Sequence, residues 1–296
     1  MKYPIGAVLA ACALLVGCAP QSQRAAPPPP VAAPPSAPAP ASQAYTGAIF
    51  VEGAFEQGGW LRGTVPPSTV RLTLGSVRVP IDPEGRFFAG LDRDAPGTLR
   101  LTATGPRGQT IARDMQVAAR EWQIERVNAP LRGNVPSERF MAIRRPELAA
   151  IAAARTVRSD SAGWTQKFIW PVKGRISGRF GSQRIYQGVP GAYHSGLDIA
   201  PGDGAPYVAP ADGVVVLAAQ KPFSLEGNLV IIDHGMGLNS AFLHSSRLAV
   251  AKGDRVRQGQ LVGYVGATGR ASGPHLHWSL KWQDARLDPL LFLPEQ

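Results

Sequence analysis

All five histidines of the 296-residue chain lie after residue 193, at positions His194, His234, His244, His275 and His277. His194 is followed four residues later by Asp198, and Gly196 and Pro201 favour extended chain over helix in this segment. Scattering of histidines over the whole chain would rarely give this clustering, and imidazole nitrogens and carboxylate oxygens are metal-ligand atoms. The only cysteines, Cys12 and Cys18, lie near the start of the chain, so a metal site further along must use His and carboxylates.

Residues 275–282 alternate between two kinds of side chain. The polar set is His275, His277, Ser279 and Lys281, and the apolar set is Leu276, Trp278, Leu280 and Trp282. This period of two predicts a half-buried strand, because successive side chains of a strand point to opposite faces. We expect the tryptophans to lie in the core and the histidines to face a cleft.

The segment from about residue 170 to 289 resembles the M23 family of zinc metallopeptidases, the LytM/lysostaphin-type peptidoglycan endopeptidases. The motifs that carry the resemblance are ISGRFG at 176–181, HSGLDIA at 194–200, DGVV at 212–215, GNLVIIDHG at 227–235, GATGR at 266–270 and GPHLHW at 273–278. A single HxH or HxxxD pair is common by chance, whereas this combination is specific.

The resemblance implies a role for each residue of the site. His194, Asp198 and His277 match the three zinc ligands, and three protein ligands leave a fourth position for water, as in catalytic zinc sites. His275 matches the residue that takes a proton from the zinc-activated water and passes it to the leaving amine. His244 matches the other non-ligand histidine, which would hold the oxyanion or orient the water.

Some nearby residues depart from the pattern or leave two interpretations open. Phe242 and Ser245 stand where the family usually has Tyr and Leu, and we expect Phe242 to fill the same packing space. His234 matches no ligand position and is interpreted as structural. Tyr186 and Tyr193 could reach the oxyanion or simply form an aromatic cleft wall. Arg179, Arg184 and Arg270 could meet substrate carboxylates or be solvated surface charges.

The start of the chain predicts export. Lys2 precedes a short apolar run over residues 5–16, which is typical of a secretory signal. Residues 15–18, LVGC, resemble a lipobox, in which Cys18 would be acylated and would anchor the protein to a membrane. An ordinary signal peptide with a chance cysteine is the alternative. The expected location is the cell envelope: periplasmic and lipid-anchored, at the outer membrane of a Gram-negative bacterium.

The rest of the sequence divides into four parts. Residues 18–44 form a lipidated cysteine and a Pro/Ala-rich linker, 45–130 a β-sandwich, 131–165 a helical connector and 166–296 the M23-type peptidase domain, after a signal peptide at 1–17. The fold class is therefore mainly β, with an antiparallel β peptidase domain. In the connector, the best helical pattern lies between Pro136 and Ala162, where Pro146 and Glu147 fit a first helical turn with Leu148, Ile151 and Ala152 on one face.

The net charge of +10 suits an anionic partner. Without a helix-turn-helix, zinc-finger or RNP-like signature, peptidoglycan is favoured and nucleic acid is not expected. The predicted function is a zinc-dependent endopeptidase that hydrolyses peptide cross-links of peptidoglycan. The alternative is a non-catalytic wall-binding regulator that activates cell-wall amidases, and a regulatory protein partner is compatible with either. A zinc storage site is disfavoured because two further histidines stand beside the ligands.

Overall fold

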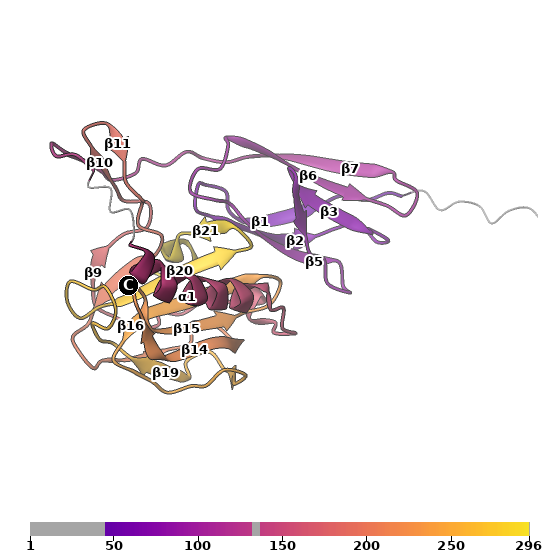
Figure 1. The fold of residues 1–296 in the computed structure, drawn as a ribbon. Coiled ribbons are helices and arrows are strands. Elements are labelled where there is room, and N and C mark those ends of the chain that lie inside the picture. The colour runs from indigo at the N-terminus through magenta and orange to yellow at the C-terminus, as the bar shows by residue number, and fades with distance from the viewer. Residues whose placement is uncertain (1–44, 132–136, 296) are drawn as a thin grey trace, which may run out of the picture. The chain divides into compact units, whose positions relative to one another are not determined.

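The computed structural model describes residues 45–131 and 137–295. The signal peptide, Cys18 and the Pro/Ala-rich linker expected over 1–44 lie outside these residues. These described residues form one compact unit, which is mainly β, as predicted (Figure 1). No helix among the described residues has the length and apolar character needed to cross a membrane.

Two antiparallel sheets form the N-terminal part, which confirms the predicted β-sandwich. The first has the order β1-β2-β5 and contains β1 (Phe50–Ala54), β2 (Trp60–Thr64) and β5 (Arg86–Gly90). The second has the order β4-β3-β6-β7 and contains β3 (Arg71–Leu74), β4 (Val77–Val79), β6 (Thr98–Thr104) and β7 (Thr110–Gln116). Leu72, Leu74, Leu101 and Ala103 are buried, whereas Val70 precedes β3 and is exposed.

An eight-stranded antiparallel sheet carries the second part of the unit. Its main path has the order β18-β14-β15-β16-β20-β12-β9, and β21 pairs with β20. The strands are β9 (Arg175–Gly178), β12 (Leu197–Ala200), β14 (Gly213–Phe223), β15 (Gly227–Asp233), β16 (Leu238–Ser245), β18 (Arg255–Val256), β20 (Leu276–Trp282) and β21 (Ala285–Leu287). The predicted alternation along β20 is confirmed, because Leu276, Trp278, Leu280 and Trp282 are buried and the residues between them are partly exposed.

Two smaller sheets flank the large one. One has the order β13-β19-β17, with β13 (Pro206–Val208), β17 (Arg247–Leu248) and β19 (Leu261–Tyr264). The other has the order β11-β10-β8, with β8 (Ile124–Val127), β10 (Gln183–Tyr186) and β11 (Val189–Pro190). Strand β8 leaves the N-terminal sandwich and pairs in parallel with β10, so the connection between the two parts is itself part of a sheet. Short 3-10 helices lie at Gly163–Thr165 and Pro289–Phe292.

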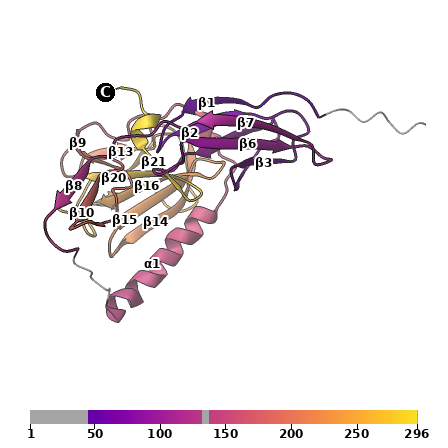
Figure 2. The same ribbon diagram turned by 90° about the horizontal axis from the view of Figure 1, so that it is seen from above.

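The helix of the connector, α1 (Glu138–Thr156), begins eight residues before the predicted start at Pro146. Ser137 caps the helix, because its side chain accepts a hydrogen bond from the Phe140 amide. This N-cap marks the start of the helix, and Pro146 lies inside it. Of the predicted apolar face, Ile151 packs against a buried cluster, whereas Leu148 is 44% exposed. The buried residues are Arg144, Glu147 and Ala154, and α1 packs on β14 and β15 (Figure 2).

One buried hydrophobic cluster runs through both parts of the unit. Trp60 of β2 packs against Phe292 near the C-terminus, with ring centroids 5.6 Å apart, and its indole nitrogen donates to the Leu291 carbonyl at 2.9 Å. Gly90 of β5 lies so close to Leu287 that a Cβ there would be 2.7 Å from a Leu287 methyl group. The sandwich and the large sheet are therefore joined by close packing as well as by the chain.

Candidate metal centre

Asp198 and His277 are brought together by strand register. Asp198 in β12 and His277 in β20 are direct partners in an antiparallel pair, so their side chains share one face. Asp198 Oδ1 and His277 Nδ1 are 2.8 Å apart. On the other side of β12, Gly178 pairs with Asp198, and a Cβ at Gly178 would lie 2.5 Å from Asp198 Oδ2. The carboxylate therefore occupies space that only a glycine leaves open.

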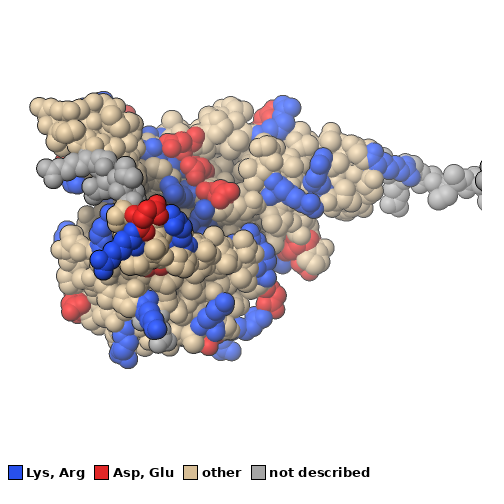
Figure 3. Space-filling view, in the orientation of Figure 1, with Lys and Arg blue, Asp and Glu red and all other residues tan. Residues whose placement is uncertain are grey.

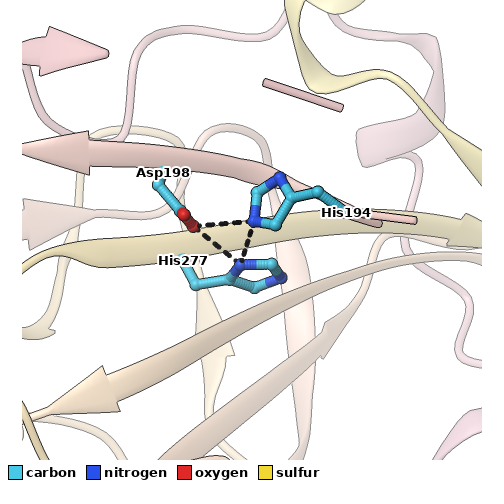
Figure 4. A group of neighbouring side chains, drawn as sticks. All are labelled: His194, Asp198 and His277. Atoms are coloured by element: carbon cyan, nitrogen blue, oxygen red, sulfur yellow. Dashed lines mark hydrogen bonds and ion pairs between the residues drawn. The ribbon is translucent and has the colours of Figure 1, made fainter. Parts of the chain in front are cut away.

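His194 completes the group from an irregular segment just before β12. Its amide donates to the Ser182 carbonyl at 2.8 Å, and its carbonyl accepts from the Gly181 amide at 2.9 Å. Its Nε2 lies 3.1 Å from Asp198 Oδ1 and 3.1 Å from His277 Nδ1. Figure 4 shows the three side chains converging on one point from separate segments of the chain.

These three donors fit a divalent metal ion. One ligand atom from each residue lies within 4.8 Å of the others. Zinc bonds of about 2.1 Å at tetrahedral angles place ligand atoms about 3.4 Å apart, a few tenths of an ångström beyond the separations here. Two imidazoles and a carboxylate form the donor set, and the His194 ring directs its Nδ1 to the Arg179 carbonyl at 3.2 Å. When the ring is neutral, Nδ1 carries the proton that donates there, and Nε2 then presents a lone pair to a metal ion.

The electrostatics of the group also favour a cation. Burial alone would raise the pKa of Asp198, but its hydrogen bonds with His194 and His277 outweigh burial and hold that pKa well below its usual range. Burial would lower the pKa of His194, but the Asp198 carboxylate outweighs it and raises that pKa. Burial lowers the pKa of His277. An ionised carboxylate thus faces two imidazoles, which is an arrangement that a bound cation stabilises.

His275 and His244 lie beside this group, and a hydrogen bond at Nδ1 fixes the tautomer of each neutral ring. His275 Nδ1 donates to the Gly273 carbonyl at 2.8 Å, and His244 Nδ1 donates to the Thr268 carbonyl at 2.8 Å. Each ring therefore keeps a bare Nε2 that can accept a proton. His275 Nε2 is 3.7 Å from Asp198 Oδ1, and the rings of His244 and His275 are 5.0 Å apart. Burial lowers the pKa of His244, which favours its neutral form.

His244 reaches the site through an unusual backbone conformation. Leu243 is the register partner of His277, so in a regular strand His244 would point to the opposite face. Its φ of 65° lies in the left-handed region, and its ring is nevertheless 6.3 Å from that of His277. Such backbone conformations in non-glycine residues cluster at functional sites. Phe242 is fully buried between Tyr207 and Trp278, as expected for a packing residue.

His234 lies apart from this group in a closed hydrogen-bond chain. Its Nδ1 donates to the Asp212 carbonyl at 2.7 Å, so its Nε2 accepts from the Ser240 hydroxyl at 2.7 Å. Ser240 in turn accepts from the Trp278 indole at 3.1 Å. Complete burial lowers the pKa of His234 to about 4. These contacts support the structural interpretation of this histidine.

A cleft of about 1290 Å³ opens over His194 and Asp198. Tyr186, Tyr193, Arg184 and Arg270 line it, together with residues of β8. Arg184 forms an exposed ion pair with Glu125 across β8 and β10 at 2.7 Å. Tyr193 packs edge-on against Phe180, which favours the cleft-wall alternative for this residue, and burial raises its pKa.

Gly178 and Arg93 shape the site but were not singled out from the sequence, and Gly196 was noted there only because it favours extended chain. Gly178 makes room for Asp198, and a Cβ at Gly196 would lie 2.7 Å from His277 Nε2. Both glycines belong to the quoted motifs, ISGRFG and HSGLDIA, so the motifs contained this signal. Arg93 of the N-terminal part, which contacts the segment beside His194, gave no signal because nothing in the local sequence relates it to the site.

The large antiparallel sheet and the three converging donors define the class of site, a candidate metal centre with two imidazoles and one carboxylate. Residues 192–289 match the model of peptidase family M23. Among the relatives, peptidoglycan DD-endopeptidase ShyA of Vibrio cholerae serotype O1 is 40% identical over 116 residues, which make up 39% of this chain and 26% of that protein. The NlpD/LppB lipoprotein homolog of Pseudomonas aeruginosa is 36% identical over 134 residues, 45% of this chain and 41% of that protein. The chain thus spans less than half the length of these relatives.

A solved structure resembles more of the chain. The crystal structure of a candidate M23 peptidase from Pseudomonas aeruginosa matches with a TM-score of 0.60 and 28% identity, covering 80% of this chain and 94% of that one. This coverage extends well beyond residues 192–289. The fold of the N-terminal part is therefore shared in large measure with that protein.

Proposed function

We propose that the chain is a zinc-dependent endopeptidase that hydrolyses peptide cross-links of peptidoglycan, with His194, Asp198 and His277 as the zinc ligands. The observation that carries this proposal is the convergence of three ligand atoms within 4.8 Å beside two further imidazoles with bare Nε2 atoms. The similarity to a protein named peptidoglycan DD-endopeptidase supports the substrate class.

Different residues of the chain would have different roles in the reaction. Zn²⁺ in this site would polarise the scissile carbonyl and lower the pKa of a water molecule. His275, whose Nε2 faces the carboxylate of Asp198, would accept the proton of the attacking water and donate it to the leaving amine. His244, held by Thr268 and by its left-handed backbone, would orient the water or the developing oxyanion. The cleft over His194 would hold the peptide.

The proposed setting is the periplasm, with an anchor to the membrane through an acylated Cys18. Peptidoglycan is the proposed partner, and the net charge of +10 suits this anionic polymer. On the face shown in Figure 3, Lys and Arg side chains are spread over the surface without gathering into one patch. Electrostatic attraction between the protein and peptidoglycan would therefore not be confined to one patch, and the cleft would recognise the peptide.

Digestion of purified peptidoglycan by the purified full chain tests the proposal. With one equivalent of Zn²⁺, the wild-type chain should release peptide fragments whose masses identify the cleaved cross-link, and His275→Ala should release none. A wild-type chain that binds zinc stoichiometrically but leaves cross-links of several wall chemistries intact would overturn the proposal. That result would favour the amidase-activating regulator, although the complete set of ligands and histidines has no evident use in such a protein.

A further inference from the structure

We propose that Arg93 of the N-terminal β-sandwich is a positioning residue for His194, so that the sandwich helps to build the metal centre. The inference rests on the proposed function, because it takes His194 as a zinc ligand. Arg93 lies in the connection between β5 and β6, 101 positions before His194 in the sequence, and is only 6% exposed.

His194 is the ligand whose position the large sheet does not fix. Asp198 and His277 lie within paired strands, whereas His194 precedes β12 in a segment without ladder pairing. Its backbone is held instead by Gly181 and Ser182 through two hydrogen bonds of 2.9 and 2.8 Å. The position of His194 therefore depends on what holds residues 181–183.

Arg93 holds that segment at two points. Its Nε and Nη2 both donate to the Gly181 carbonyl, at 3.3 and 3.1 Å, and Nη2 also donates to Gln183 Oε1 at 3.2 Å. Gly181 thus accepts from Arg93 on one side and donates to His194 on the other. Gln183 in turn holds the backbone close to the ligand, because its Nε2 donates to the carbonyl of Gly191, three residues before His194, at 2.7 Å.

Aromatic packing fixes the guanidinium itself. Arg93 Cζ lies 5.0 Å from the centre of the Trp122 ring and 4.6 Å from that of Tyr193, the residue adjacent to His194. A planar guanidinium between two rings combines stacking with cation–π attraction, which lysine does not reproduce. A Cβ on Gly181 would collide with the Trp122 ring, so this glycine is needed for the close approach.

Loss of the Arg93 side chain should loosen the ligand without removing it. The Gly181 carbonyl and Gln183 amide would lose their buried donor, and Tyr193 would lose a packing partner. Outer contacts that orient a metal ligand are typically worth about 10- to 100-fold in metal affinity. We therefore expect Arg93→Ala to weaken zinc binding by at least about tenfold, while Asp198 and His277 remain in place in their paired strands.

Zinc affinity of the full chain, measured by competition with a chromophoric chelator, tests the inference. Arg93→Ala should lower the zinc affinity by about tenfold or more. Arg93→Lys keeps the charge but lacks the planar guanidinium, and it should lower the zinc affinity by less. The matched control is Arg100→Ala in β6 of the same sandwich, whose pair with Asp114 is exposed, and its zinc affinity should equal that of the wild type. Thermal unfolding of each zinc-free variant separates a change in stability from a change in affinity.

An unchanged zinc affinity in Arg93→Ala would overturn the inference, even if the variant unfolds at a lower temperature. Should Arg93→Ala fail to fold, Arg93→Lys decides, and wild-type zinc affinity in that variant would contradict a positioning role. Failure of the proposed function looks different, because the wild-type chain itself would then bind no zinc or cleave no peptidoglycan.

Discussion

Asp198 and His277 face each other across β12 and β20 as direct register partners, with 2.8 Å between Oδ1 and Nδ1. A one-residue slip of either strand would send one of the two side chains to the opposite face of the sheet. Two of the three proposed ligands are therefore fixed by the pairing of the large sheet. The third ligand, His194, depends on loop contacts.

Gly196→Ala should disturb the site from within the HSGLDIA motif. A Cβ at this position would lie 2.6 Å from the Trp278 carbonyl and 2.7 Å from His277 Nε2, so either β20 or the His277 ring must move. We expect zinc affinity to fall by about tenfold or more, measured by chelator competition. The control is Gly97→Ala, where a Cβ meets nothing closer than 4.0 Å. Equal affinity in the two variants would contradict the close packing described here.

His234 should make the free energy of unfolding depend on pH. Its folded-state pKa of about 4 is below the ordinary value of 6.5. Between these pH values the unfolded chain binds a proton that the folded chain does not, so stability falls as the pH drops from 6.5 toward 4. The loss attributable to His234 is about 3 kcal/mol at the lower end.

Urea unfolding at pH 7 and pH 4 measures this effect. His234→Asn keeps a donor for the Asp212 carbonyl but has no titrating ring. It should be less stable than the wild type at pH 7 and should lose less stability between the two pH values. Parallel pH profiles for the two proteins would show that His234 is not buried in its neutral form.

Arg144 should be the residue that fastens α1 to the sheet. It donates to Glu226 through both terminal nitrogens, at 2.6 and 2.7 Å, and to Glu147 at 3.0 Å, in a largely buried group. Arg144→Ala leaves two carboxylates without their cation and should lower the free energy of unfolding by about 3 kcal/mol. Arg145→Ala is the matched control, because its pair with Glu138 is exposed, and should cost less than about 1 kcal/mol. Similar costs for the two variants in urea unfolding would show that the Arg144 group contributes little.

The strands of the peptidase part followed from local sequence. The alternation of β20 is visible at 275–282, and the apolar runs at 214–217 and 229–232 fall within β14 and β15. The three converging donors were also predictable, because motif spacing and the resemblance to a known family pointed to the same residues. In these segments local pattern and tertiary structure agree.

Helix α1 and the Arg93 contact were not predictable in the same way. The buried face of α1 includes Arg144 and Glu147, and Arg144 donates to Glu226, which is 82 residues away in the sequence. No helical periodicity in the local sequence could therefore reveal this face. Arg93 similarly reaches a segment 88 residues away. Buried polar contacts between distant residues leave no periodic pattern, whereas apolar faces do.

Zinc content after exhaustive dialysis of three full-length proteins tests the central claim most directly. The wild-type chain should retain one equivalent, Asp198→Ala should retain almost none, and His275→Ala should retain one equivalent while losing activity on peptidoglycan. Retention of zinc by Asp198→Ala, or equal loss in Asp198→Ala and His275→Ala, would contradict the assignment of His194, Asp198 and His277 as the ligands and His275 as the base.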